Sequence, residues 1–259
     1  MEREEDMPQL FGLEGRTALV TGSSQGIGLA LASALADAGA AVILNGRSRQ
    51  ALEAAASPLR ARGAQVEVEV FDVTDAQAVR DGIARIEARR PVDILVNNAG
   101  IQRRAPLETF NDADWDALMA TNLSSVYYVS KTLAPFMIER GRGKIINIGS
   151  VQCELARPGI APYTATKGAV KNLTRGMCAD WAKYGLQINA IGPGYFDTPL
   201  NKALVEDAAF DAWLRKRTPA GRWGKLDDLH GAAVFLASSA SDFVNGQTIY
   251  VDGGILSVI

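Results

Sequence analysis

The chain has 259 residues, of which 47% are hydrophobic and 22% are charged, as in an ordinary globular protein. Its formal net charge is −2, so it has no basic field that would attract nucleic acid or an anionic membrane. Two cysteines and one histidine exclude the common zinc-ligand spacings, and we predict no metal site.

Three features of the sequence bear on where the protein is expected to reside. Residues 1–9 are acidic and have no apolar core of a signal peptide, so we expect a flexible tail there. No apolar run approaches the roughly 20 residues that cross a bilayer. The two isolated cysteines, Cys153 and Cys178, favour a reducing, cytoplasmic setting.

From residue 10 onward, short apolar runs alternate with longer helical patterns. Strands are predicted at Thr17–Thr21, Ala41–Leu44, Val66–Phe71, Ile94–Val96, Lys144–Ile148, Leu186–Ile191 and Thr248–Val251. Helices are predicted at Leu29–Ala38, Gln50–Arg62, Ala76–Arg89, Trp115–Arg140, Tyr163–Lys183 and Leu226–Ala237. This alternation indicates an α/β fold, a single doubly wound Rossmann-type domain over residues 10–259 with about seven parallel strands and helices on both faces.

One segment, Gly192–Arg222, breaks the alternation between the sixth strand and the last helix. It contains Pro193, Gly194, Pro199 and Pro219, and it is predicted to be irregular. A long connection of this kind is often functional, and we expect a lid over the substrate site at 192–222.

A glycine-rich turn follows the first strand, in the spacing Gly-x3-Gly-x-Gly. Glycines there permit a tight turn and a close approach of backbone to a pyrophosphate, which the following helix N-terminus attracts. An ordinary glycine-rich loop is the alternative interpretation. We expect a dinucleotide to contact Gly22, Ser24, Gln25, Gly26, Ile27 and Gly28.

The end of the second strand bears on the choice between NADP and NAD. Where an acidic residue would bond the ribose 2′-hydroxyl of NAD, the chain has Asn45, and Arg47 follows closely. Arg47 suits a 2′-phosphate, so NADP is favoured and NAD stays possible. The alternative is that Arg47 and Arg49 are only solvated loop charges.

The next two strands also end in candidate cofactor residues. Asp72 and Val73 follow the third strand and are placed to contact adenine, unless this stretch only caps the next helix. The fourth strand is followed by small residues, Asn98, Ala99 and Gly100, which let backbone pass close to a ribose.

After the fifth strand come three residues whose side chains suit the oxidation of an alcohol: Ser150, Tyr163 and Lys167. Ser150 ends that strand, and Tyr163 and Lys167 lie at i and i+4, on one face of a helix. A tyrosine has a pKa of about 10, which a nearby ammonium would lower toward the range of a useful base. Ser150 can hold the reacting oxygen by a hydrogen bond.

The motifs TGSSQGIG (21–28), NNAG (97–100), Ser150, Tyr163-x3-Lys167 and VDGG (251–254) together resemble the short-chain dehydrogenase/reductase family. The resemblance implies that Ser150, Tyr163, Lys167 and Asn122 are catalytic, with Asn122 holding a helix kink and a water that relays protons to Lys167. It also implies an NADP-dependent enzyme, commonly a homotetramer. Further cofactor contacts are implied for Tyr163, Lys167, Pro193, Gly194, Phe196 and Thr198.

Stretches 100–108, 150–163 and 217–224 are similar to a subfamily that acts on sugar acids, which implies interconversion of D-gluconate and 5-dehydro-D-gluconate. We expect Arg104 to bind the carboxylate and Gln152 a hydroxyl, with Arg103 as another cation and Glu154 as another polar group nearby. The expected substrate contacts are Arg104, Ser150, Gln152, Tyr163 and Tyr195.

Three other functions stay open. The enzyme could act on another sugar acid, or on 3-oxoacyl thioesters of a carrier protein. A carrier protein would need a basic docking patch, for which Arg103, Arg104, Arg140 and Arg142 are candidates. A binding protein that senses NADP without turnover is the third alternative, although such a protein would not need both Tyr163 and Lys167.

Overall fold

The computed structural model describes residues 10–259, so the predicted tail over 1–9 lies outside the described residues. One parallel sheet has seven strands in the order β3-β2-β1-β4-β5-β6-β7. Its strands are β1 (Thr17–Val20), β2 (Ala41–Gly46), β3 (Val66–Val70), β4 (Ile94–Asn97), β5 (Gly143–Ile148), β6 (Leu186–Pro193) and β7 (Thr248–Val251). The order reverses between β1 and β4, which confirms the doubly wound fold class.

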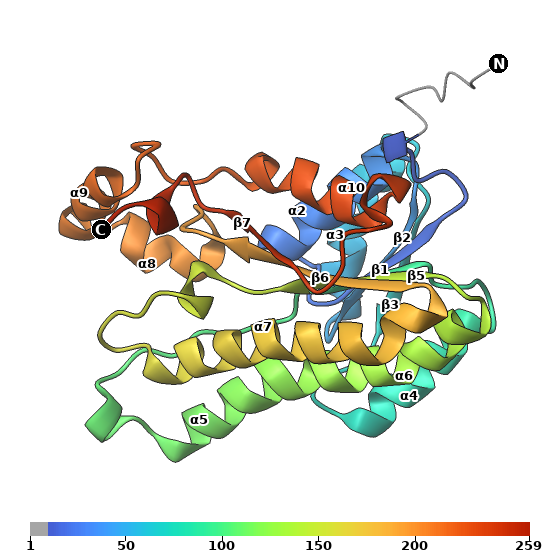
Figure 1. The fold of residues 1–259 in the computed structure, drawn as a ribbon, viewed down its shortest axis with the longest axis horizontal. Coiled ribbons are helices and arrows are strands. Elements are labelled where there is room, and N and C mark those ends of the chain that lie inside the picture. Colours follow the sequence, from blue (N-terminus) through green and yellow to red (C-terminus); the bar gives the residue numbers. More distant parts are fainter. Residues whose placement is uncertain (1–9) are drawn as a thin grey trace.

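Helices cover both faces of the sheet (Figure 1). On one face lie α2 (Gly26–Asp37), α3 (Arg49–Ala61) and α10 (His230–Ala237). On the other face lie α4 (Ala76–Glu87), α5 (Asp112–Met119), α6 (Ser125–Glu139) and α7 (Ala161–Trp181). Two further helices, α8 (Lys202–Val205) and α9 (Ala208–Arg217), lie at one end of the molecule, on the side of the C-terminus.

The core is split in two by the sheet, because successive side chains of a strand point to opposite faces. Val20 and Leu44 pack in the cluster under α2, α3 and α10, while Leu19 and Ile43 pack in the cluster under α4, α6 and α7. These four side chains are fully buried or nearly so. Both faces of the central strands are covered, which explains why they read as continuous apolar runs.

The helix predicted over Trp115–Arg140 is wrong in two respects. It begins earlier, at Asp112, where the Asn111 side chain accepts a hydrogen bond from the Ala113 amide at 2.8 Å. It is also interrupted by a π-helical turn, Ala120–Ser124, which separates α5 from α6. Such a turn inserts an extra residue into the helix and redirects the side chains there.

The prediction that the segment 192–222 is irregular is wrong for part of it. Strand β6 extends to Pro193, and α8 and α9 follow. Helix α9 begins where the Asp207 carboxylate accepts hydrogen bonds from the amides of Ala209 and Phe210, and three basic residues close it. The lid function remains a prediction.

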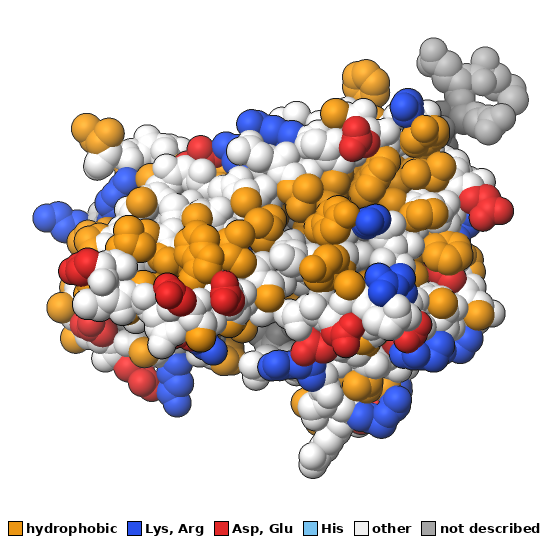
Figure 2. Space-filling view, turned by 90° about the horizontal axis from the view of Figure 1, so that it is seen from below, with side chains coloured by type: hydrophobic (Ala, Val, Ile, Leu, Met, Phe, Trp, Pro, Cys, Tyr) orange, Lys and Arg blue, Asp and Glu red, His pale blue; other side chains and the backbone are white. Residues whose placement is uncertain are grey.

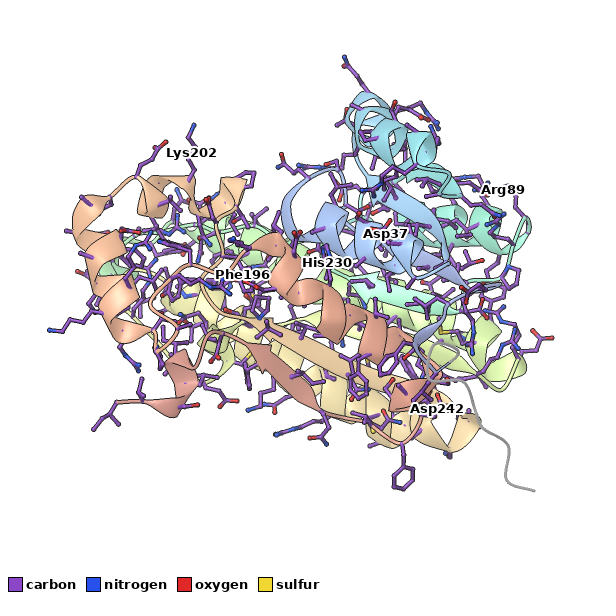
Figure 3. The ribbon with its side chains drawn as sticks, turned by 90° about the horizontal axis from the view of Figure 1, so that it is seen from above. Asp37, Arg89, Phe196, Lys202, His230 and Asp242 are labelled. Atoms are coloured by element: carbon purple, nitrogen blue, oxygen red, sulfur yellow. The ribbon has the colours of Figure 1, made fainter. Side chains whose placement is uncertain are left out.

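Two sequence-based exclusions can be compared with residues 10–259. No helix in this range is long and apolar enough to cross a membrane. The same residues hold no group of three or more His, Cys, Asp or Glu side chains arranged for a metal ion. His230 begins α10 near Phe196 (Figure 3), with its Nε2 3.7 Å from Asp227.

A chain of buried polar side chains ties the middle of the sheet to α7. Asn97 Nδ2 donates to Asn147 Oδ1 at 2.8 Å, and Asn147 Nδ2 donates to Thr174 Oγ1 at 2.9 Å. All three side chains are buried, so no water can replace a lost partner. Each link therefore fixes the position of α7 relative to β4 and β5.

We expect Thr174→Val to destabilise the protein by about 1–3 kcal/mol, because the buried Asn147 amide would lose its acceptor. The matched control is Thr132→Val, since Thr132 makes the same bond to the carbonyl four residues earlier but no other. Chemical denaturation of both variants measures the difference. Equal losses would show that the bond to Asn147 adds nothing.

Candidate active site

A pocket of about 730 Å³ lies along the carboxyl ends of β1, β2, β4, β5 and β6. This is where ligands bind in open α/β sheets, next to the point where the strand order reverses. The structure brings all the predicted cofactor residues to this pocket: Gly22, Ser24, Gln25, Gly26, Ile27, Gly28, Asn45, Arg47, Asp72, Val73, Asn98, Ala99, Gly100, Tyr163, Lys167, Pro193, Gly194, Phe196 and Thr198.

The glycine-rich turn has no room for side chains at two positions. A Cβ on Gly22, whose φ is 59°, would lie 2.8 Å from the Ala99 Cα. One on Gly28 would lie 2.4 Å from Asn98 Nδ2. Helix α2 starts at Gly26 with no side-chain cap and no acidic residue in its first turn. Its first amides are therefore suited to an anion in the pocket.

The turn is held against the loop that follows β4. Thr21 Oγ1 accepts hydrogen bonds from the amides of Asn98 and Ala99, at 3.0 and 3.1 Å. In return, Asn98 Nδ2 donates to the carbonyls of Thr21 and Gly22, at 2.9 and 3.0 Å. The two loops thus form one rigid floor of the pocket, in which the Asn98 side chain holds the backbone of Thr21 and Gly22 in place.

At the end of β2, Asn45 and Arg47 differ sharply in their surroundings. Asn45 is fully buried, and its Nδ2 donates to the carbonyls of Glu69 and Phe71, while its Oδ1 has no partner among the described residues. Arg47 is exposed at the rim, with no acidic group of residues 10–259 within 4.0 Å. A free cation at this place suits a phosphate.

The residues after β3 divide the two roles that the sequence left open. Asp75 caps α4, accepting hydrogen bonds from the amides of Gln77 and Ala78. Asp72 instead accepts bonds from the Thr74 amide and hydroxyl, at 2.9 and 2.7 Å, and lines the pocket with Val73. The cap and the candidate adenine contact are therefore different residues.

Ser150, Tyr163 and Lys167 meet in the part of the pocket beyond β5. Ser150 is buried, and its Oγ accepts a hydrogen bond from the Gln152 amide at 3.1 Å. Tyr163 and Lys167 lie in the first turns of α7, with the Lys167 Nζ 5.7 Å from the centre of the Tyr163 ring. The same Nζ donates to the Ile148 carbonyl at 2.7 Å, which anchors α7 to β5.

Asn122 does not line the pocket. It sits buried in the π-helical turn, where its Oδ1 accepts from the Ile101 amide at 2.8 Å and its Nδ2 donates to the Ile101 carbonyl at 3.0 Å. The Nδ2 also lies 3.3 Å from Thr166 Oγ1. Its side chain therefore holds the loop after β4 against α7, and the implied proton relay stays a prediction.

The two neighbouring arginines after β4 have different partners. Arg103 forms an ion pair with Asp114 at 2.9 Å. Arg104 lines the pocket and contacts no acidic group of residues 10–259 within 4.0 Å; its Nη2 lies 3.5 Å from Asn201 Oδ1. Of the two, Arg104 is the cation left for a ligand.

Gln152 also reaches the pocket with capacity to spare. It is buried, its Nε2 lies 3.4 Å from the Tyr195 hydroxyl, and its Oε1 has no partner among the described residues. Glu154, by contrast, is outside the pocket, where it accepts hydrogen bonds from Tyr250 and Lys171. Only Gln152 of this pair is available to a substrate hydroxyl.

Sequence reasoning missed several lining residues, among them Asn201, Leu204 and Arg157. Asn201 and Leu204 come from the start of α8 and its preceding turn, which we had predicted to be irregular. Arg157 lies on the loop between Ser150 and Tyr163. The signal was available for Arg157, because a loop joining two reactive residues must run beside the reaction centre.

The basic patch needed for a carrier protein is not formed by the four arginines proposed. Arg140 pairs with Glu87 at 2.7 Å, and Arg142 lies 3.4 Å from Asp93. Both precede β5, whose opposite end opens into the pocket. Arg103 and Arg104 are therefore separated from them by the length of the strand.

Comparison with known proteins agrees with this geometry. The chain matches the family model described as enoyl-(acyl carrier protein) reductase over residues 22–256. It is 62% identical to gluconate 5-dehydrogenase of Gluconobacter oxydans (strain 621H), over 96% of this chain and 97% of that protein. It is 50% identical to 5-keto-D-gluconate 5-reductase of Escherichia coli (strain K12), over 98% of this chain and 100% of that protein.

A crystal structure of a gluconate 5-dehydrogenase from Burkholderia cenocepacia J2315, in complex with NADP and tartrate, has a TM-score of 0.96 to this chain. The two are 60% identical, and the match covers 97% of this chain and 99% of that one. The chain belongs to the short-chain dehydrogenase/reductase family.

Burial sets the titration of the two ionisable groups that this family member places beyond β5. It raises the pKa of Tyr163 to about 12, an effect that the neighbouring Ser150 hydroxyl and Arg104 only partly oppose. It lowers the pKa of Lys167 to about 8. We expected the Lys167 ammonium and a bound, positively charged nicotinamide together to lower the pKa of Tyr163; in the protein alone, desolvation of the phenolate outweighs the attraction by Arg104.

The lowered pKa of Lys167 makes stability depend on pH. Between a folded-state value of about 8 and an unfolded value of 10.5, the unfolded chain binds more protons, so stability rises with pH across this window. From about pH 7.5 to about pH 9.5, the free energy of unfolding of the wild type should rise by about 2 kcal/mol more than that of Lys167→Met.

Chemical denaturation at the two pH values measures this difference. Tyr163 contributes little here, since its raised pKa affects stability only as pH rises above 10. Lys183→Met, at an exposed lysine just after the same helix, serves as the control and should behave like the wild type. Equal gains for the wild type and Lys167→Met would contradict a buried, destabilised ammonium.

Proposed function

We propose that the chain is an NADP(H)-dependent oxidoreductase that interconverts D-gluconate and 5-dehydro-D-gluconate. The observation that carries this proposal is one continuous pocket with an unpaired arginine at each end, Arg47 after β2 and Arg104 beyond β4. A phosphorylated dinucleotide and a sugar acid are both anionic, and together they place negative charge at both ends. The names of the relatives support the same pair of ligands.

The residues of the pocket fit NADP. The uncapped start of α2 and the tight approach of Gly22 to Ala99 suit the pyrophosphate. Arg47 would bind the 2′-phosphate, and Asn45 leaves no acidic group to repel it. When bound, the nicotinamide would accept or donate the hydride, and in its oxidised form it would add a positive charge beside Tyr163.

The chain's own residues would manage the proton. Because its pKa is about 12, the Tyr163 phenol is protonated at neutral pH, which suits the acid that protonates the ketone oxygen during reduction. In the reverse direction, the phenolate takes the proton of the substrate hydroxyl. Ser150 would hold the reacting oxygen, and the Lys167 ammonium would favour the phenolate.

The remaining groups have supporting parts in this proposal. Gln152, with its free Oε1, would accept a hydrogen bond from a substrate hydroxyl, and Tyr195 would pack against the sugar chain. Asn122 would support a proton path to Lys167 by fixing the π-helical turn and the loop after β4. The segment 192–222 would act as the lid, because Asn201 and Leu204 already line the pocket.

We propose a homotetramer as the working form. Figure 2 shows apolar side chains gathered in several patches on the side of α6 and α7. Large side chains are exposed on this layer at Trp115 of α5, Tyr127 of α6 and Tyr184, just after α7. Exposed apolar patches of this kind support subunit contacts.

A reducing, cytoplasmic setting is also a proposal. It rests on Cys153 and Cys178, both of which are free thiols in the described chain. Burial raises the pKa of Cys153, and its Sγ lies 3.1 Å from the Lys167 carbonyl. A protein made for an oxidising compartment would more often pair such residues.

The function is tested by initial rates of NADP reduction, followed through the near-ultraviolet absorbance of the reduced nicotinamide. We expect D-gluconate to be oxidised faster than other sugar acids, polyols or 3-hydroxyacyl thioesters. Tyr163→Phe should lower kcat by about 10²- to 10⁴-fold while NADP binding is retained, because only the proton-transfer group is removed.

Tyr184→Phe, which removes the same hydroxyl from an exposed tyrosine, is the control and should keep full activity. Activity with another alcohol but not with gluconate would reject the substrate and leave the mechanism. Full turnover by Tyr163→Phe would reject the mechanism itself.

Arg47→Gln tests the cofactor preference. It should raise the KM for NADP by about 10- to 100-fold and leave the KM for NAD nearly unchanged, because one charge-assisted contact to the 2′-phosphate is lost. Arg49→Gln, two residues further on at the start of α3 and outside the pocket, should alter neither value. A wild type that prefers NAD would contradict the role of Arg47.

A further inference from the structure

Arg157 is an arginine of the pocket that the proposed function has not used. It lies on the loop between the turn at Val151–Cys153 and helix α7, so it is carried between Ser150 and Tyr163. It lines the same pocket as these two residues and is partly buried. The loop therefore brings a second guanidinium to the reaction centre, besides that of Arg104.

The charge of Arg157 is not neutralised within the described protein. No Asp or Glu side chain of residues 10–259 lies within 4.0 Å of it, although most arginines that flank the sheet have such a partner. Its Nε is buried and donates to no acceptor in this part of the chain. A buried donor on a charged group without an acceptor is costly, unless a ligand supplies one.

Aromatic side chains hold Arg157 in place. Its guanidinium carbon lies 5.4 Å from the centre of the Phe210 ring, which belongs to α9. Tyr195 is close enough for the charge of Arg157 to lower the pKa of its phenol, against the larger raising effect of burial. Phe210 and Tyr195 pack on each other with their ring centres 5.6 Å apart. The flat face is thus covered and one part of the donor edge contacts the Tyr195 hydroxyl, while Nε is left without an acceptor.

Arg104 and Arg157 form a pair of like charges. Burial lowers the pKa of Arg104, and the charge of Arg157 lowers it further. Two guanidinium groups this close repel each other, and no carboxylate of the described chain lies between them. A ligand carboxylate between the two would relieve the repulsion and supply the missing acceptor for Nε.

We propose that Arg157 is a second carboxylate-binding residue, which together with Arg104 makes the pocket select sugar acids over neutral polyols. This inference rests on the proposed function and assigns the acid selectivity of that site. Gln152 lies on the same loop, and its Oε1 lacks a donor that a substrate hydroxyl could supply. The loop between Ser150 and Tyr163 would then recognise two groups of the substrate, the carboxylate through Arg157 and a hydroxyl through Gln152.

The alternative is that Arg157 only braces α9 through Phe210, with no contact to substrate. The two roles differ in what they discriminate. A brace would affect acids and neutral analogues alike, whereas a carboxylate ligand would affect only acids. D-Gluconamide is the matched neutral probe, because it keeps every hydroxyl of D-gluconate and replaces only the carboxylate.

The test compares Arg157→Gln with the wild type on both compounds. We expect the KM for D-gluconate to rise about 10- to 100-fold with kcat little changed, and kcat/KM for D-gluconamide to change less than about 3-fold. Arg157→Lys, which keeps the charge but loses the forked geometry, should have a KM for D-gluconate between those of the wild type and Arg157→Gln. Phe210→Leu, which keeps Arg157 but removes the ring that holds it, should raise the KM for D-gluconate by less than Arg157→Gln does and change kcat/KM for D-gluconamide by less than about 3-fold.

Calorimetry gives a second readout that does not depend on turnover. D-Gluconate is titrated into protein saturated with NADPH, which cannot oxidise it, and the Kd should rise by the same factor in Arg157→Gln. If the variant binds D-gluconate as tightly as the wild type, or if its kcat/KM for D-gluconamide falls by the same factor as that for D-gluconate, Arg157 is not a carboxylate ligand. If the wild type neither binds nor oxidises D-gluconate, the proposed function fails, which is a separate result.

Discussion

The site depends on the close approach of two strand ends, β1 and β4, at the place where the sheet order reverses. Ala99 lies so near Gly22 that no side chain fits there, and Thr21 and Asn98 lock the two loops together with four hydrogen bonds between them. This floor keeps the start of α2 open to the pocket, so that its uncapped amides face a ligand. The same turn also holds the end of β2, because Ser23 Oγ accepts a hydrogen bond from the Asn45 amide at 3.0 Å.

Burial and unpaired charge explain the rest of the site. The Lys167 ammonium is held by the Ile148 carbonyl in surroundings that disfavour its charge, and the Tyr163 phenol beside it is kept protonated by the same desolvation. In contrast, Arg47, Arg104 and Arg157 keep their charges without acidic partners in the described chain. The protein alone is therefore electrostatically incomplete in this pocket, and anionic ligands complete it.

Much of this could be predicted from the sequence, because the decisive patterns are local. Apolar runs gave the strands, and the spacing of Tyr163 and Lys167 on a helix, after a strand that ends in Ser150, placed the chemistry. The π-helical turn at Ala120–Ser124 could not be predicted from residue propensities; only the resemblance implied a helix kink at Asn122, and the contacts of Asn122 explain it. The place of Arg157 on the loop between Ser150 and Tyr163 was a signal in the sequence, but only the acceptor that its Nε lacks in three dimensions makes it a candidate ligand.

The measurement that tests the central claim most directly uses D-gluconate that carries deuterium at C5, with NADP as the acceptor. We expect the NADPH formed to carry one deuterium per turnover and the sugar product to be 5-dehydro-D-gluconate, since hydride transfer from C5 to the nicotinamide is the proposed reaction. Mass spectrometry of both products gives the answer. NADPH without deuterium, or a ketone at another carbon, would contradict the account even if NADP is reduced.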